Sequence, residues 1–228
     1  MAQASTLSAA TEVRFNRFLA LVYMIMALGM VITAWAATSV SNNEELMKRI
    51  LYNPWFAFGL FMLQIILVVA LTAAVTRLST GAALLMFLFY SALTGVSLSA
   101  IFIYYSQSTI SYTFWVAAGM FFFSSLLGFF IKGEMSGVGR FLMLALLGWL
   151  FGSIIVLFFP SPGMNQAMNF MGILLFAGLT VWDTNRLRAF SQQLDGKKGM
   201  GSMAVVGALA LYLDFINLFL LLLRTSRR

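Results

Sequence analysis

Seven long apolar runs constrain this chain more than any other feature. A helix needs about 20 consecutive apolar residues to cross the hydrocarbon core of a bilayer. The approximate limits of the runs are Phe18–Val40, Trp55–Thr76, Gly81–Tyr105, Ser111–Ile131, Phe141–Phe159, Ala167–Leu187 and Met203–Leu223. We therefore predict an all-α membrane protein with seven transmembrane helices over residues 18–224. A short polar segment, residues 1–17, precedes this domain, and a basic tail, residues 225–228, follows it.

Composition excludes several classes of function. Only 9% of the residues are charged, against about 25% in a soluble domain. The sequence contains no cysteine and no histidine, so thiol chemistry, disulfides and the commonest zinc ligands are absent. No glycine-rich phosphate loop is present either. We expect no enzymatic activity and no cofactor.

The charge of +7 points to the membrane and not to nucleic acid, because the basic residues lie in the loops and at the chain ends. A cytoplasmic N-terminus puts most of them on the inner side, as the positive-inside rule requires. These inner residues are Arg14, Arg17, Arg77, Lys132, Arg140, Arg186, Arg188, Lys197 and Lys198. In the first outer loop, Glu44 and Glu45 balance Lys48 and Arg49.

The C-terminus fits this orientation less well. Seven full spans place Arg224, Arg227 and Arg228 outside, whereas a re-entrant last segment would place them inside. We keep seven spans because Met203–Leu223 is long and contains no proline.

Two aspartates, Asp183 and Asp214, lie inside apolar runs. An ionisable side chain in a membrane span is expensive and usually faces a protein interior or a water path. Asp214 lies near the middle of its span and shares a helix face with Asn217. Asp214 can alternatively be a purely structural buried acid.

Asp183 lies nearer a span end and shares a face with Thr180 and Thr184. The alternative for Asp183 is a solvated carboxylate paired with Arg186 or Arg188.

If the two aspartates meet, they cannot both ionise cheaply and will share one proton. Such a pair would close at low pH, and at higher pH it would repel or take up a cation such as Ca²⁺. Arg77, at the end of the second run, can hold the cluster closed or can be an orientation anchor. Ser91, Gly95 and Ser99 form a small-residue seam that favours close helix packing.

Four segments resemble the Bax inhibitor-1 family of transmembrane Bax inhibitor motif proteins. The segment GALALYLDFINLFLLLLR, residues Gly207 to Arg224, is similar to the C-terminal signature of that family. FAGLTVWDTNRLR, residues Phe176 to Arg188, resembles its sixth-span motif. YSALTGVSLSAIF resembles the third span, and TFWVAAGMFFFSSLLGF with KGEMSG resembles the fourth span and the following loop.

The resemblance, to the bacterial branch, implies a last helix enclosed by the other six and a pH-dependent calcium leak controlled by an aspartate pair. Asp183 and Asp214 match the two family aspartates, and Arg77 stands where relatives have a basic residue near the sixth-span aspartate. Trp182 replaces the usual tyrosine, Asn185 the usual glutamine, and Gly133 a basic loop residue.

The leading hypothesis is a pH-sensitive calcium leak channel of the bacterial inner membrane, with Ca²⁺ and protons as partners and Asp183 and Asp214 as the gate and calcium ligands. Thr180, Thr184 and Asn217 would support the pair, and Arg77 would latch it. One alternative is a regulatory membrane protein that modulates a membrane protease or stress-response complex through a membrane protein partner. Another is a proton-coupled cation transporter.

Overall fold

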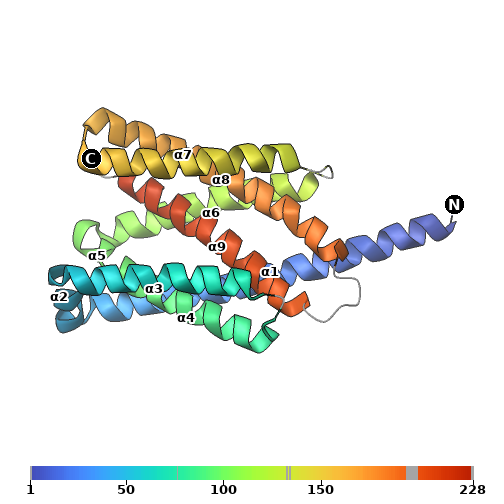
Figure 1. Ribbon diagram of the computed structural model, residues 1–228, viewed down its shortest axis with the longest axis horizontal. Helices are drawn as coiled ribbons and strands as arrows, with labels where there is room; N and C mark the ends of the chain where they lie inside the picture. Colours follow the sequence, from blue (N-terminus) through green and yellow to red (C-terminus); the bar gives the residue numbers. More distant parts are fainter. Residues whose placement is uncertain (1, 76, 132, 134, 194–199, 227–228) are drawn as a thin grey trace. The chain divides into compact units, whose positions relative to one another are not determined.

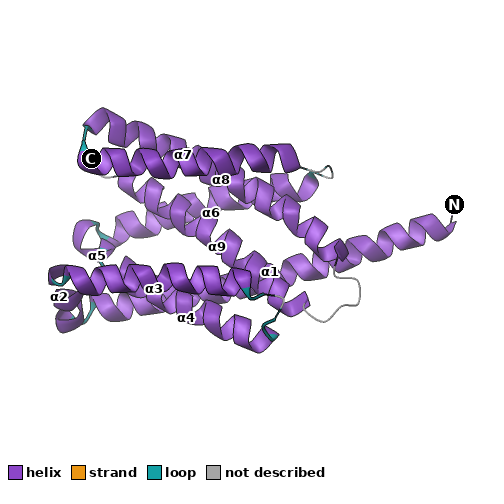
Figure 2. Cartoon of the chain, in the orientation of Figure 1, coloured by secondary structure: helices purple, strands orange, loops and turns teal. Residues whose placement is uncertain are grey.

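The computed structural model describes residues 2–75, 77–131, 133, 135–193 and 200–226, and within these ranges all regular structure is helical (Figures 1 and 2). The helices are α1 (Ala2–Ser41), α2 (Glu44–Tyr52), α3 (Pro54–Ala73), α4 (Thr80–Leu98), α5 (Ile101–Tyr104), α6 (Gln107–Phe130), α7 (Ser136–Phe158), α8 (Pro162–Gln193) and α9 (Met200–Thr225).

Seven stretches of these helices are long and apolar enough to cross a membrane. They are Phe15–Ser41, Pro54–Ala73, Thr80–Tyr104, Gln107–Phe130, Ser136–Phe158, Pro162–Ser191 and Met200–Thr225. The predicted all-α membrane fold with seven spans is confirmed. Because α1 already begins at Ala2, residues 2–17 of the polar segment extend the first helix instead of preceding it.

The last span is the most buried, as predicted. In α9, 67% of the most apolar stretch is buried, against 6% in α3 and 11% in α7. Because lipid is as apolar as leucine, the hydrophobic effect does not drive helices together inside a membrane. A helix that buries most of its surface in protein is therefore held there by close packing and polar contacts. The carboxylate of Asp214 is therefore placed in protein and not in lipid.

The chain forms two compact units that share α8 and α9. The first unit comprises Met1–Tyr104 and Ala189–Tyr212, and the second comprises Tyr105–Arg188 and Leu213–Arg228. In the first unit, α4 packs against both α1 and α3. A Cβ added at Gly95 would lie 2.7 Å from the Cβ of Ala36, so the predicted small-residue seam is the place where α4 meets α1.

A buried polar cluster joins the helices of the first unit. The hydroxyl groups of Thr33 and Tyr212 lie 2.6 Å apart, and Thr33 donates to the carbonyl oxygens of Gly29 and Ser91, each at 2.9 Å. Nearer the unit's surface, the Gln64 amide donates to the Ser97 hydroxyl at 2.6 Å. Each contact satisfies a polar group that would be costly in an apolar interior.

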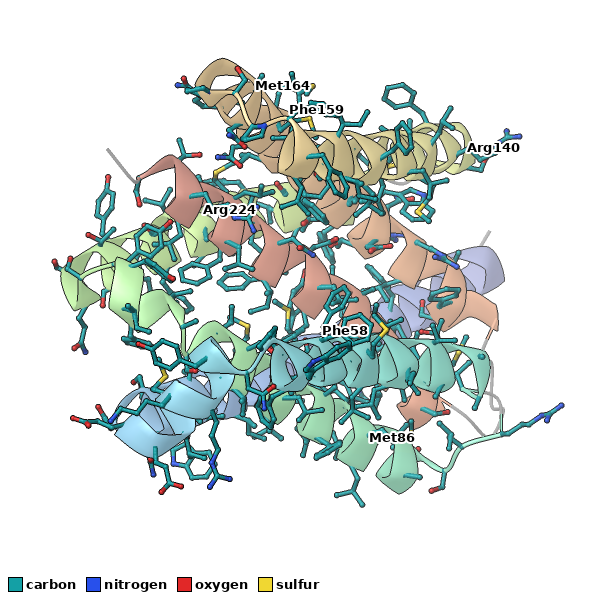
Figure 3. All side chains as sticks on the ribbon, turned by 60° about the vertical axis from the view of Figure 1, so that its left-hand side comes forward. Phe58, Met86, Arg140, Phe159, Met164 and Arg224 are labelled. Carbon is teal, nitrogen blue, oxygen red and sulfur yellow. The ribbon has the colours of Figure 1, made fainter. Side chains whose placement is uncertain are left out.

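In the second unit, α7 and α8 run beside each other, with Arg140 and Phe159 at opposite ends of α7 (Figures 1 and 3). Trp149 of α7 donates its indole N–H to the carbonyl oxygen of Met168 in α8 at 2.9 Å. Near the start of α7, a Cβ on Gly139 would overlap the indole of Trp182. The two helices therefore contact each other near the start and at the middle of α7.

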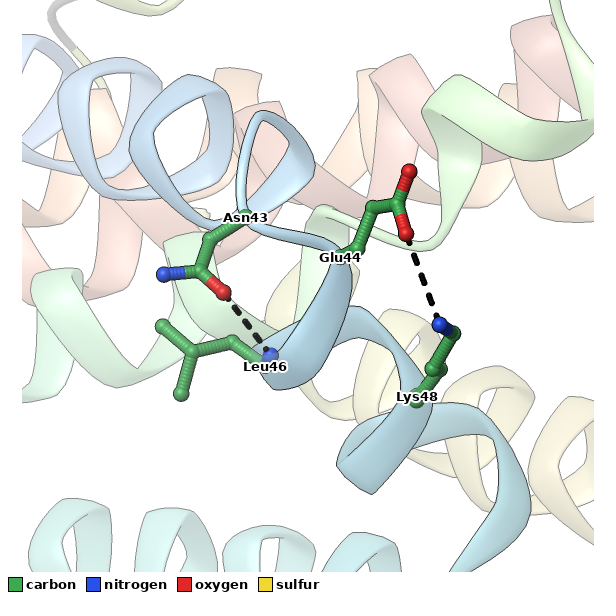
Figure 4. Close-up of polar contacts among 4 residues, drawn as sticks. All are labelled: Asn43, Glu44, Leu46 and Lys48. Atoms are coloured by element: carbon green, nitrogen blue, oxygen red, sulfur yellow. Dashed lines mark hydrogen bonds and ion pairs between the residues drawn. The ribbon is translucent and has the colours of Figure 1, made fainter.

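The sequence did not predict α2. Asn43 caps this helix by accepting a hydrogen bond from the Leu46 amide at 3.1 Å (Figure 4). The Lys48 ammonium lies 3.4 Å from the Glu44 carboxylate (Figure 4), and Arg49 lies 2.7 Å from Glu45. The charge balance expected in this loop thus takes the form of ion pairs one helical turn apart.

The third span is not the continuous helix expected from Gly81 to Tyr105. It breaks between α4 and α5, where the Ser99 hydroxyl donates to the Val96 carbonyl oxygen at 2.7 Å. A serine side chain competes with the backbone for such carbonyls, which gives the break a local cause.

Candidate functional site

Asp183 lies well inside α8 and not at its end. The helix continues to Gln193, past the predicted limit at Leu187. Thr184 and Leu187, which follow Asp183, are both buried. Asp183 itself is half-buried, and the Arg186 guanidinium is close enough to act electrostatically on it. Pairing of Asp183 with Arg186, the alternative to a gating role, stays a prediction.

Asp214 is buried within the same unit. Its side chain is only 5% exposed. The neighbouring ring of Phe215 packs edge-on against Phe114 and Phe121, with ring centroids 5.5 and 5.7 Å apart. A carboxyl group as buried as that of Asp214 has little solvent to stabilise a negative charge.

The carboxyl groups of Asp183 and Asp214 lie within hydrogen-bonding reach of each other. An ionised carboxylate only accepts hydrogen bonds, so two of them cannot bond to each other unless a proton lies between them. Thr180 also reaches Asp214, and its hydroxyl group lies 2.8 Å from the Phe176 carbonyl oxygen, to which it can donate.

One oxygen of Asp214 is unsatisfied. Among the described residues, Oδ2 of Asp214 is buried and has no hydrogen-bond partner. A buried polar atom left without a partner costs about 1–3 kcal/mol. The site therefore carries an acceptor able to bind a proton, a hydroxyl group or a cation.

Thr184 and Asn217, also predicted to support the pair, make other bonds. The Thr184 hydroxyl lies 3.0 Å from that of Ser125 in α6. The Asn217 amide donates to the Leu213 carbonyl oxygen of its own helix at 2.8 Å. Of the three supporting residues, Thr180 is the one with a bond to the carboxyl pair.

Sequence reasoning missed how α8 holds the end of α6. The Asn185 amide donates to the Ile131 and Gly133 carbonyl oxygens at 2.6 and 3.3 Å, and Arg188 donates to the Phe129 carbonyl oxygen at 3.0 Å. The last carbonyls of a helix lack partners within it. The polar run Thr184–Arg188, at the end of an apolar span, is the signal that indicates such a role.

Arg77 is exposed in the turn between α3 and α4 and belongs to the first unit. Its role as a latch partner of Asp183 stays a prediction.

A closed metal site is not formed here. Within the described part of the chain, no group of three or more carboxylates, histidines or cysteines could hold a metal ion. Calcium takes six to eight oxygen ligands, and two carboxyl groups supply too few. Calcium ligation by Asp183 and Asp214 stays a prediction.

These features define a multi-pass helical membrane protein with a carboxyl pair in its interior. A family model described as "Inhibitor of apoptosis-promoting Bax1" matches residues 15–226. The chain therefore belongs to the Bax inhibitor-1 family, and the resemblance found in its motifs is confirmed.

Bacterial relatives match over nearly the full length. The chain is 40% identical to the inner membrane protein YbhL of Escherichia coli K12, over 91% of this chain and 89% of the relative. It is 38% identical to an uncharacterized protein of Borreliella burgdorferi, over 92% and 90% of the two chains. An uncharacterized membrane protein of Streptococcus pyogenes serotype M1 is 36% identical, over 96% and 95%.

Proposed function

We propose that this protein is a pH-sensitive calcium leak channel, gated by the shared proton of Asp183 and Asp214. The observation that carries the proposal is the hydrogen-bonding reach between these two carboxyl groups inside one compact unit. The proposal includes no enzymatic activity and no cofactor.

The proposed gate works through repulsion. With one proton between the carboxyl groups, the hydrogen bond holds α8 and α9 together at this point. When the pH rises and the proton leaves, two unit charges about 4 Å apart repel by about 4 kcal/mol at an effective dielectric constant of about 20. That energy corresponds to a shift of about a thousandfold in a two-state equilibrium. We therefore expect calcium flux to rise with pH.

The unsatisfied Oδ2 of Asp214 supports a cation as the permeant species. Once both carboxyl groups are ionised, they offer hard oxygen ligands, which Ca²⁺ prefers. The nearby Arg186 offsets part of the repulsion, and its charge keeps a passing cation from binding too tightly.

We place the protein in the bacterial inner membrane with a cytoplasmic N-terminus. The location is supported by the Escherichia coli relative YbhL, which is named as an inner membrane protein. The orientation rests on the distribution of lysine and arginine between the loops.

The test is calcium entry into liposomes that contain the purified protein and an internal calcium indicator, at stepped external pH. We expect flux that rises with pH in the wild type and in Glu44→Gln, which removes an exposed carboxylate outside the pair. Asp183→Asn and Asp214→Asn should each abolish the pH dependence. Unchanged flux and pH dependence in both aspartate variants would contradict the proposal.

Two other results would replace the proposal with one of its alternatives. Uphill calcium movement driven by a proton gradient would identify a transporter, because a leak cannot move ions uphill. An absence of flux, together with a stoichiometric protein partner crosslinked in native membranes, would identify a regulatory protein.

A further inference from the structure

An apolar groove of about 500 Å³ lies between α7 and α8 in the second unit. Its lining residues on α7 are Phe141, Leu142, Ala145, Gly148 and Trp149, and on α8 they are Met168, Met171, Leu174 and Leu175. Both helices are candidate membrane spans, so the groove opens within the depth of the bilayer. It is separate from the carboxyl pair, none of whose residues line it.

Small residues on α7 explain why the groove is hollow. A Cβ added at Gly148 would meet no atom within 4 Å, and the next lining residue toward Phe141 is Ala145. On either side of Ala145, by contrast, α7 and α8 touch closely through Trp149 with Gly172 and through Gly139 with Trp182. The helices are therefore held apart at the groove by fixed contacts on either side and do not collapse into it.

Two arginines lie near the Phe141 end of the groove. Arg140 directly precedes Phe141, is exposed, and points away from this end of α7 (Figure 3). Across the helix pair, Arg186 lies 5.2 Å from the centre of the Trp182 ring, which itself packs on Gly139. Two exposed arginines and an indole thus flank one end of an apolar groove, as at a membrane interface.

The geometry points to a binding site for one anionic phospholipid of the surrounding bilayer, with an acyl chain in the α7–α8 groove and its phosphate at Arg140 and Arg186. The apolar lining matches a hydrocarbon chain, and it offers no hydrogen bonds to a peptide or a sugar. Arginine forms paired hydrogen bonds with phosphate oxygens. Basic residues at the membrane surface favour anionic over zwitterionic lipids.

The test uses the full-length protein, reconstituted with equal amounts of phosphatidylglycerol and phosphatidylcholine and then analysed by native mass spectrometry for retained lipid. We expect the wild type to retain one phosphatidylglycerol molecule in preference to phosphatidylcholine. Arg140→Gln should reduce that preference about fivefold. This is the change in affinity expected when one basic residue near an anionic membrane surface is removed.

Gly148→Leu should abolish retention, because its side chain fills the groove. Gly119→Leu is the matched control, since Gly119 lies on α6 with equally open space around its Cα and outside the groove. Ala145→Leu serves as a second filling variant if Gly148→Leu does not fold. Equal retention by the groove-filling and control variants, or a wild type without lipid preference, would overturn the assignment.

Discussion

At Asp214, a carboxyl group is kept in an apolar interior with one oxygen unsatisfied. Such an oxygen costs about 1–3 kcal/mol, and a well-packed hydrophobic side chain at this position would avoid that cost. A membrane-embedded acid retained at this expense is by default a functional residue. The alternative, an acid that serves only to hold two helices together, would leave calcium flux and its pH dependence unchanged in Asp214→Asn.

A substitution at Gly128 tests how closely α6 and α8 pack beside Asp183. A Cβ at Gly128 would lie 2.9 Å from the Cβ of Thr184, so Gly128→Ala should destabilise the protein by about 1–3 kcal/mol through overpacking. Thermal unfolding in detergent measures this change. Gly119→Ala, where the added Cβ meets nothing within 4 Å, should be neutral or slightly stabilising because alanine favours helix over glycine. Equal effects of the two substitutions would refute the close packing.

The Tyr212 hydroxyl gives a second prediction for a single residue. It lies 2.6 Å from the Thr33 hydroxyl in a buried cluster. Tyr212→Phe leaves the ring in place and removes one hydrogen bond, so it should cost about 0.5–1.5 kcal/mol. Tyr112→Phe, at an exposed position, should leave the unfolding temperature unchanged in the same measurement. A Tyr212→Phe protein as stable as the wild type would show that this bond contributes nothing.

For the helices, hydropathy predicted the number and the approximate limits of the spans, because a bilayer imposes a minimum length on each apolar run. It did not predict α2, which is short, amphipathic and stabilised by a cap and two ion pairs. It also missed the break at Ser99 and the continuation of α8 past Leu187. Those features depend on individual hydrogen bonds and on single polar residues. Hydropathy averaged over a long window does not show the effect of one such residue.

The candidate site was predicted less completely than the spans. Burial of Asp214 followed from its mid-span position, but its approach to Asp183 depends on which faces of α8 and α9 meet, and spacing within one helix does not determine that. The motif resemblance supplied the pairing. The bonds of Asn185 and Arg188 to the end of α6 were not expected, because no local pattern shows which carbonyls a neighbouring helix leaves open.

The contrast in burial between α9 and α3 predicts their tolerance of a large side chain. Val205 in α9 is fully buried, whereas Val69 in α3 is 59% exposed. Val205→Trp should therefore prevent a monodisperse folded protein in fluorescence-detected size-exclusion chromatography, because a packed core has no room for an indole. Val69→Trp should elute like the wild type. Similar profiles for both variants would contradict the burial of α9.

For the whole molecule, the absence of native cysteine makes topology directly measurable. With a cytoplasmic N-terminus and seven spans, single cysteines at Glu44 and Ser226 should react with a membrane-impermeant maleimide added outside intact cells. A cysteine at Ser136, the first residue of the fifth span, should react only after the membrane is permeabilised. Protection of Ser226→Cys from the external reagent would show that the last segment does not cross the membrane.

The central claim is that one proton shared by Asp183 and Asp214 controls the leak. The most direct measurement follows the infrared carbonyl band of protonated carboxyl groups and the calcium flux of the same reconstituted protein through one pH titration. We predict that a band absent from Asp183→Asn and Asp214→Asn is lost as pH rises, with the same midpoint as the rise in flux. A flux that changes with pH while this band stays constant would contradict the account.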